Sequence, residues 1–391
     1  MEENKNKNVK KIIIGVSIAV ATIVVVVCFV IAYNNINLSD NQTNTTTTNS
    51  SNSSSSSKTT TSNSKNLNIT SGGSYDLSGE YESVIVNTSE EVILNLNGVE
   101  ITNSSGPAIN IEKAKKVTIA VSGTNKIKAT TSEDLDGAIY SKADLVLEGT
   151  GTLEVKSNYD GIVSKDTLVI KNGTYTINSD DDGIRGKDSV EISDGTFTIN
   201  AGGDGIKASN DEDSELGYVN ITGGTYNITA KSDGIQGITK ATISGGSFNI
   251  KAAEGIEATL IKIDDGTINI EASDDGINAS KKSNISTPTV EINGGNITIK
   301  MGQGDTDGID SNGNIYINGG TINITGNSAF DYDGTAEKNG GKIIVNGTET
   351  NTITNQMMGG GMKGEMPGQM KQNENMQNGG EMQMNGGRRG R

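Results

Sequence analysis

The sequence predicts an all-β protein, a parallel β-helix (solenoid) of about a dozen coils. Two observations lead to this prediction. The phrase Asp-Gly-Ile recurs with a period near 22 residues, ending at Ile184, Ile206, Ile235, Ile277 and Ile309. Between the copies, apolar and polar residues alternate on both sides of a glycine turn, as in Val190 to Ile199. Alternation with a period of two indicates strands, and self-similarity at a fixed period of 20–50 residues indicates a solenoid.

Each repeat reads as two or three short strands joined by tight corners. Looser copies of the phrase end at Ile139, Ile162 and Ile256, and Ser328-Ala329-Phe330 stands at the same point of a later repeat. Glycine and aspartate between the strands favour tight turns. Stacked coils would bury their isoleucines and valines on the coils above and below. The same inward position is aromatic in four successive repeats, which predicts an internal stack of Tyr175, Phe197, Tyr226 and Phe248.

Composition excludes several classes of function. The 391 residues include no histidine and no tryptophan, and their formal net charge is −16. The absence of histidine removes histidine-based zinc sites and histidine-dependent catalytic triads. The single cysteine, Cys28, lies in an apolar segment, so we expect no disulfide within the fold. The strong acidity argues against nucleic acid as a partner, and we expect the β-helix to be a monomer.

The N-terminal part predicts a membrane anchor. Residues 1–11 carry a cluster of lysines, and residues 12–32 contain no charge over a length that can span a bilayer as a helix. The positive-inside rule then places the N-terminus in the cytoplasm and the rest of the chain outside the cell. A cleaved signal peptide and a lipoprotein at Cys28 are the alternatives, but no small-residue cleavage site or good lipobox is present.

Two low-complexity segments flank the predicted β-helix. Residues 33–65 are rich in Ser, Thr and Asn, so we expect a disordered linker that holds the β-helix of residues 66–353 away from the membrane. Residues 354–391 are rich in Gly, Met and Asn. This composition indicates a disordered tail, although its methionines also suggest copper binding.

The repeated aspartates predict a row of carboxylates. Equivalent residues of successive coils stack about 4.8 Å apart, where adjacent carboxylates repel by about 1 kcal/mol in water and more in a partly buried site. Oxygen ligands of this kind suit Ca²⁺, and the alternative is that each aspartate only bonds the backbone of its own corner. The candidate calcium ligands are Asp180, Asp182, Asp204, Asp233, Asp274, Asp275, Asp305, Asp307, Asp310 and Asp331.

The residue after each repeated isoleucine forms a second row. Arg185 and Lys207 stand in this row on adjacent coils, beside Asp182 and Asp204. They could pair with those aspartates along the row, contact the carboxylate of an acidic ligand, or act as a base. The same row continues through Gln236.

Two repeats are longer than the others. One insertion follows Ser209 and is acidic, and the other follows Ser280 and carries Lys281 and Lys282. Both follow the same corner, so stacking should project them from one edge. We expect a cleft between them, with the short repeats around Asp233 and Glu254 as its floor.

These features together resemble a known family. With its Asp-Gly-Ile corners and Ile-x-Gly-Gly-Thr-aromatic-x-Ile strands, the chain resembles the clostridial cell-surface carbohydrate-binding proteins, parallel β-helices related in fold to pectate lyases. The resemblance covers roughly Leu67 to Ile353. It implies Ca²⁺ as a cofactor and binding of cellulose and polygalacturonate-like polymers. The degenerate corners at Glu254 and at Ser328-Ala329-Phe330 weaken the case for metal there.

The expected function is therefore a membrane-anchored, extracellular, calcium-dependent binding protein for acidic or cellulosic polysaccharide. One alternative is a β-helix polysaccharide lyase, in which Ca²⁺ acidifies a proton beside a uronate carboxylate and Lys or Arg removes it. The other is an adhesive or structural surface rod without a sugar ligand. The candidate carbohydrate contacts are Arg185, Lys207, Gln236 and Tyr218.

Overall fold

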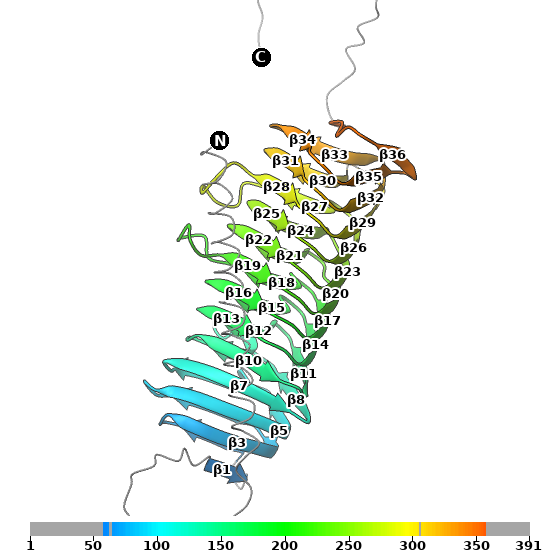
Figure 1. Ribbon diagram of the computed structural model, residues 1–391. Coiled ribbons are helices and arrows are strands. Elements are labelled where there is room, and N and C mark those ends of the chain that lie inside the picture. Colours follow the sequence, from blue (N-terminus) through cyan, green and yellow to red (C-terminus); the bar gives the residue numbers. More distant parts are fainter. Residues whose placement is uncertain (1–57, 62–64, 305, 357–391) are drawn as a thin grey trace, which may run out of the picture. The chain divides into compact units, whose positions relative to one another are not determined.

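The computed structural model describes residues 58–61, 65–304 and 306–356, which consist of strands and turns. The strands form one 24-stranded and one 12-stranded sheet in which equivalent strands of successive coils pair in parallel. Figure 1 shows these coils stacked in order from β1 to β36. The predicted all-β fold with long parallel sheets is thus confirmed, and the 12 strands of the smaller sheet agree with the dozen coils expected.

The 12-stranded sheet carries the Asp-Gly-Ile phrases and is called the ladder face below. Its strands are β2 (Asn66–Ile69), β4 (Ser83–Asn87), β6 (Ile109–Lys113), β9 (Gly137–Ser141), β12 (Asp160–Ser164), β15 (Ile184–Gly186), β18 (Ile206–Ala208), β21 (Asp233–Gly237), β24 (Glu254–Ala258), β27 (Ile277–Ala279), β30 (Asp307–Ser311) and β33 (Ser328–Tyr332).

The 24-stranded sheet contains two further rows of strands. The middle row, which follows the ladder face in each coil, consists of β7 (Lys116–Ser122), β10 (Leu145–Gly149), β13 (Thr167–Ile170), β16 (Ser189–Ile192), β19 (Tyr218–Ile221), β22 (Lys240–Ile243), β25 (Leu260–Ile263), β28 (Thr289–Ile292), β31 (Asn314–Ile317) and β34 (Ala336–Lys338). The third row consists of β8 (Thr124–Ala129), β11 (Thr152–Ser157), β14 (Thr174–Ser179), β17 (Thr196–Ala201), β20 (Thr225–Thr229), β23 (Ser247–Ala252), β26 (Thr267–Ala272), β29 (Asn296–Met301), β32 (Thr321–Thr325) and β35 (Lys342–Val345).

The first and last coils depart from this plan. Strand β5 (Glu91–Asn103) is long enough to pair with both β7 and β8, and β3 (Gly73–Tyr81) pairs with β5 on one side and with β1 (Lys58–Thr61) on the other. At the other end, β36 (Thr348–Thr350) pairs antiparallel with β35. Strand β1 lies inside the segment expected to be a disordered linker, so that expectation is wrong for residues 58–61.

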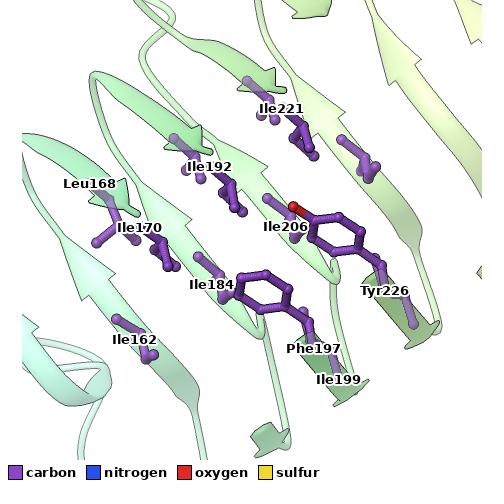
Figure 2. Packing of buried hydrophobic residues seen from close by; sticks show 14 of the residues in the cluster. Ile162, Leu168, Ile170, Ile184, Ile192, Phe197, Ile199, Ile206, Ile221 and Tyr226 are labelled. Atoms are coloured by element: carbon purple, nitrogen blue, oxygen red, sulfur yellow. The ribbon is translucent and has the colours of Figure 1, made fainter. Parts of the chain in front are cut away.

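The core is the space that the three rows enclose. Because every second residue of a strand points inward, the alternating isoleucines, valines and leucines of all three rows meet there. Figure 2 shows Ile184 and Ile206 of the ladder face, Ile192 of the middle row and Phe197 of the third row pointing into one shared interior. All four side chains are buried.

Aromatic residues of the third row stack as the sequence predicts. The ring centroids lie 5.1 Å apart from Tyr175 to Phe197, 4.8 Å from Phe197 to Tyr226 and 4.5 Å from Tyr226 to Phe248, and adjacent ring planes are within 11° of parallel. The hydroxyl groups of Tyr175 and Tyr226 satisfy their buried oxygens by donating to the carbonyls of Asn172 and Gly223 at 2.7 Å.

The glycine of the repeated phrase is required by the approach of neighbouring coils. A Cβ atom on Gly183 would lie 2.6 Å from the carbonyl oxygen of Gly205 and 2.6 Å from the side chain of Ile199. The Gly205 carbonyl is itself the acceptor for the N–H of Ile184 in the preceding coil. A side chain here would therefore disrupt the hydrogen bonding that joins the coils.

Several sequence expectations lie outside the described residues. These are the transmembrane helix at residues 12–32, the cytoplasmic segment, most of the linker and almost all of the tail. The part of the chain that the structure describes holds no helix with the length and apolarity that a membrane crossing requires.

Truncating the aromatic stack should weaken the whole fold. We predict that Phe197→Ala lowers the free energy of unfolding by about 3–5 kcal/mol, because it removes a buried ring and leaves a cavity. The measurement is the midpoint of chemical unfolding followed by far-UV circular dichroism. The matched control is Thr196→Ala, an exposed position on the same strand, and equal midpoints for the two variants would contradict the packing described here.

Candidate metal and carbohydrate site

The aspartates of four successive repeated phrases, from Asp160 to Asp233, form a hydrogen-bonded ladder. The backbone N–H of Asp182 donates to Oδ1 of Asp160 at 2.9 Å, that of Asp204 to Oδ1 of Asp182 at 2.8 Å, and that of Asp233 to Oδ1 of Asp204 at 2.9 Å. The sequence left open that each aspartate bonds only the backbone of its own corner. For these residues that alternative is wrong. Each carboxylate bonds the corner of the next coil, and so one of its oxygens holds two coils in register.

The first part of this ladder is neutralised by the protein's own cations. Nε of Arg185 lies 2.7 Å from Oδ2 of Asp160, and the same guanidinium also pairs with Asp136. Nζ of Lys207 lies 2.7 Å from Asp204 and 3.4 Å from Asp182. We call Asp136, Asp160, Asp182 and Asp204 the lower ladder. Of the roles considered for Arg185 and Lys207, the geometry shows ion pairing along the ladder.

The next coils hold a different arrangement. The amide of Gln236 donates to Asp233 and to Oε2 of Glu257, and Lys282 forms an ion pair with Glu257. Oxygens of Asp233, Glu254 and Glu257 lie within 4.8 Å of one another. Burial raises the pKa of Glu254 to about 7, with help from the charge of Glu257. This middle cluster is thus crowded with carboxylates but already contains an amide and an ammonium group.

The last ladder coils bring together Asp275, Asn278, Asp307, Asp310 and Asp331, called the upper cluster below. Asn278, Asp310 and Asp331 are register neighbours on β27, β30 and β33. Burial, followed by the charges of Asp275, Asp331 and Asp307, raises the pKa of Asp310 to about 7. Among the residues that the structure describes, no lysine or arginine forms an ion pair with Asp310 or Asp331.

Within the described part of the chain, two oxygens of the upper cluster lack any hydrogen-bond partner. They are Oδ1 of Asn278 and Oδ1 of Asp331, both shielded from solvent, and the Asn278 residue as a whole is only 8% exposed. A buried polar atom without a partner costs free energy. Asn278 and Asp331 stand two coils apart, one on each side of Asp310. A hard cation beside Asp310 would satisfy an unpartnered oxygen and neutralise the surrounding charge, so the donor set of the upper cluster fits Ca²⁺.

Short distances between carboxylates, taken alone, would indicate a metal site outside the upper cluster. In the described part of the chain, the carboxylate groups whose oxygens all lie within 4.8 Å are the middle cluster and the set Asp160, Asp181 and Asp182. Arg185 and Lys207 already contact the second set, and Lys282 the first. Oδ1 of Asp136 in the lower ladder also lacks a hydrogen-bond partner among the described residues, but the carboxylate of Asp136 pairs with Lys165 and Arg185. The upper cluster combines unpartnered oxygens with two carboxylates, those of Asp310 and Asp331, that form no ion pair in the described part of the chain, and this combination favours it as the metal site.

The remaining predicted site residues are Asp180, Asp274, Asp305 and Tyr218. Asp180 and Asp274 are exposed at the corners that precede the ladder, and Asp305 lies outside the described residues. Tyr218 opens β19 in the middle row, where its hydroxyl donates to Glu191 at 2.8 Å, so it does not join Arg185, Lys207 and Gln236 on the ladder face. The predicted ligands omit Asn278 and Glu257, which the position after the repeated isoleucine could have identified.

The two long insertions flank one cavity, as expected. Residues 210–215 and residues 283–285 line a cavity of about 550 Å³. Among the described residues, Thr239 forms the floor of this cavity. Asp233 and Glu254, which were expected there, begin strands β21 and β24 of the ladder face instead. The expected floor was wrong because the insertions leave the coil after the ladder strands, at the start of the middle row.

Comparisons with known proteins identify the family to which the chain belongs. A family described as "Carbohydrate-binding domain-containing protein" matches residues 63–308 and 254–388. A curated protein of the same description from Acetivibrio thermocellus is 30% identical over 119 residues, which span 27% of this chain and 42% of the relative. A solved structure of a polysaccharide lyase-like protein from C. thermocellum, a gadolinium derivative, is 32% identical with a TM-score of 0.44, covering 54% of this chain and 89% of that one.

Without metal, the protein should lose stability as the pH rises. Glu254 and Asp310 have a folded-state pKa of about 7, above their ordinary values of 4.5 and 3.8. Between those values the folded state binds more protons than the unfolded state, so the stability that these groups contribute is present below about pH 4 and is lost as the pH rises to about 7. We predict a lower melting temperature at pH 8 than at pH 5.5 in EDTA, measured by calorimetry. A melting temperature that rises over this interval would contradict the prediction.

Proposed function

Because the chain belongs to the family of carbohydrate-binding domain-containing proteins, we propose that it is a calcium-dependent polysaccharide-binding protein whose ligands are polygalacturonate-like polymers and cellulose. The chain covers less than half of the matched relative's length. The polysaccharide ligands and the calcium dependence therefore go beyond what this match shows and are proposed here. The observation that carries the proposal is the upper cluster, where shielded oxygens without partners among the described residues lie on the strands that flank Asp310, whose pKa is raised to about 7.

The proposal assigns the calcium to the upper cluster. Asp275, Asp307, Asp310 and Asp331 would supply carboxylate oxygens, and Asn278 would supply its amide oxygen. When bound, the ion supplies positive charge that carboxylates of the protein and of a uronate can share. The chain's own residues hold the acidic groups in register, through the strand pairing of β27, β30 and β33.

Electrostatics explains why a cation is needed. The chain has a formal net charge of −16, so a polyuronate would be repelled in the absence of metal. The lower ladder cannot relieve this repulsion, because Arg185 and Lys207 are already shared among its own aspartates. Their side chains are 18% and 26% exposed, and we propose that they, with Gln236, have a supporting role on the ladder face outside the calcium site, on the coils that precede it.

The lyase alternative has less support. A lyase needs a base that can accept a proton beside the metal. Although burial lowers the pKa of the Lys207 ammonium, Asp182 and Asp204 raise it above its usual range, and Asp160 and Asp136 do the same for Arg185 against the effect of burial. Both groups are therefore held protonated at neutral pH, which favours binding over catalysis.

The proposal also includes the location. Residues 12–32 would anchor the protein in the cytoplasmic membrane, and the Ser/Thr/Asn-rich segment would hold the β-helix at the cell surface. Support for the location comes from the sequence alone.

Calcium should stabilise the fold through the upper cluster. We predict that Ca²⁺ at millimolar concentration raises the melting temperature, because a ligand bound only by the folded state stabilises it. Asp310→Asn should abolish most of this shift. The matched control is Asp211→Asn in the exposed acidic insertion, which should keep the shift of the unmodified protein. Equal melting in EDTA and in Ca²⁺ would leave the upper cluster without a metal.

Binding of polygalacturonate should need the same ion. We predict that the protein is retained by immobilised polygalacturonate in Ca²⁺, is released by EGTA, and binds more weakly at half-molar salt, because exposed charge pairs are screened within about 3–10 Å at such ionic strengths. Asp310→Asn should weaken retention. Equal retention in EGTA and in half-molar salt would show that calcium does not bridge protein and sugar.

A further inference from the structure

Asn278 links the upper cluster to the coil before it. On one side its register neighbour is Glu257 on β24, and on the other side it is Asp310 on β30. Nδ2 of the Asn278 amide donates to Oε2 of Glu254 at 3.1 Å. Oδ1 of the same amide is shielded from solvent and has no hydrogen-bond partner among the described residues. One end of this buried amide is thus held by a protein group, and the other end is not.

Glu257 is the direct register neighbour of Asn278, but it does not hold the amide. Its carboxylate already contacts three donors, which are Gln236, Ser280 and Lys282. Glu254, at the start of the same strand, accepts the hydrogen bond from Asn278 instead. The two glutamates of β24 therefore have different partners, although their oxygens lie within 4.8 Å of one another in the middle cluster.

The contact with Glu254 determines which way the amide of Asn278 faces. A carboxylate accepts hydrogen bonds and does not donate them, so it favours the orientation in which Nδ2 faces Glu254. The opposite orientation would place the partial negative charge of Oδ1 against the carboxylate, which is unfavourable. With Nδ2 held in this way, Oδ1 is kept as an oxygen donor of the kind that Ca²⁺ binds.

We propose that Glu254 is a positioning residue for calcium, because it holds the amide of Asn278 with Oδ1 free to coordinate an ion beside Asp310. Glu254 acts through Asn278 and does not itself coordinate the ion. Partners that orient metal ligands in this way typically contribute about 10–100-fold to metal affinity. The inference rests on the proposed function, since it presupposes the calcium site of the upper cluster.

A purely electrostatic role for Glu254 is the alternative to be separated from positioning. Any carboxylate near the site attracts a cation, whether or not it contacts Asn278. Glu257 provides the matched comparison, because it has the same charge, lies on the same strand and has partners other than the Asn278 amide.

The test measures the Ca²⁺ affinity of the full chain by titration calorimetry at pH 8, above the pKa of Glu254. The single variants are Glu254→Gln and the charge control Glu257→Gln. A second pair consists of Asn278→Asp alone and Asn278→Asp combined with Glu254→Gln. The luminescence lifetime of bound Tb³⁺, an ion that takes similar oxygen ligands, reports whether water replaces a protein oxygen on the metal. The melting temperature in EDTA is recorded for every variant.

We expect Glu254→Gln to weaken Ca²⁺ binding about ten-fold. Glutamine both donates and accepts hydrogen bonds, so it no longer selects one orientation of the Asn278 amide. The Tb³⁺ lifetime should shorten, because water takes the place of Oδ1. Glu257→Gln should cause a smaller loss of affinity and leave the lifetime unchanged. Melting in EDTA should not fall for Glu254→Gln, because this variant removes a carboxylate from a crowded cluster.

The Asn278→Asp background removes the need for orientation. Both side-chain oxygens of an aspartate can bind the ion, so either direction presents a ligand. In this background Glu254→Gln should cause no loss of Ca²⁺ affinity, because it also relieves repulsion between two carboxylates. Comparing the effect of Glu254→Gln in the two backgrounds isolates the coupling between residues 254 and 278.

Three results would overturn the inference. Equal weakening by Glu254→Gln in both backgrounds would show that its charge alone attracts the ion. An unchanged Ca²⁺ affinity in Glu254→Gln, with binding still abolished by Asp310→Asn, would refute the positioning role and leave the proposed calcium site intact. Absence of Ca²⁺ binding by the unmodified protein would refute both.

Discussion

The structure depends on a single constraint, the parallel stacking of each coil on the next. Every residue meets its equivalent from the neighbouring coil at the strand spacing of about 4.8 Å, so like residues stack on like. For isoleucine and for the rings of Tyr175, Phe197, Tyr226 and Phe248, this repetition is favourable because it buries apolar surface continuously. For aspartate it is unfavourable, because it places carboxylates side by side.

On the ladder face, the stacked carboxylates are stabilised by different groups in different coils. In every ladder hydrogen bond described above, a carboxylate oxygen accepts the backbone N–H of the following coil, so part of the charge is stabilised by the same contacts that set the register. Arg185 and Lys207 pair with other carboxylate oxygens of the lower ladder, where Oδ1 of Asp136 has no hydrogen-bond partner among the described residues. Gln236 and Lys282 pair with those of the middle cluster. In the upper cluster the position of Arg185 is taken by Asn278, Asp310 and Asp331, and this change from cation to oxygen donor is what points to a bound metal.

Much of this could be predicted from the sequence, because in a solenoid the spacing between repeats determines which residues become neighbours. The period placed Asp182 beside Asp204 and Phe197 beside Tyr226, and the structure agrees. The spacing of the repeats does not predict which way a side chain points or which path an insertion takes. It did not show that Asp182 bonds the next coil, that Lys282 reaches Glu257 from an insertion, or that Tyr218 lies in another row. Strand β1 was missed because Lys58–Thr61 has the composition of a linker and becomes a strand only by pairing with β3.

The central claim is that the ladder is neutralised by protein groups in its lower part and by calcium in its upper cluster. The most direct measurement is a crystal structure of the protein grown with Ca²⁺, with the ion located by its anomalous scattering. The account predicts an ion among Asp275, Asp307, Asp310 and Asp331, with Oδ1 of Asn278 as a ligand, and none beside Arg185 and Lys207. An ion between Asp160 and Asp182, or an upper cluster filled only by water at saturating calcium, would contradict it.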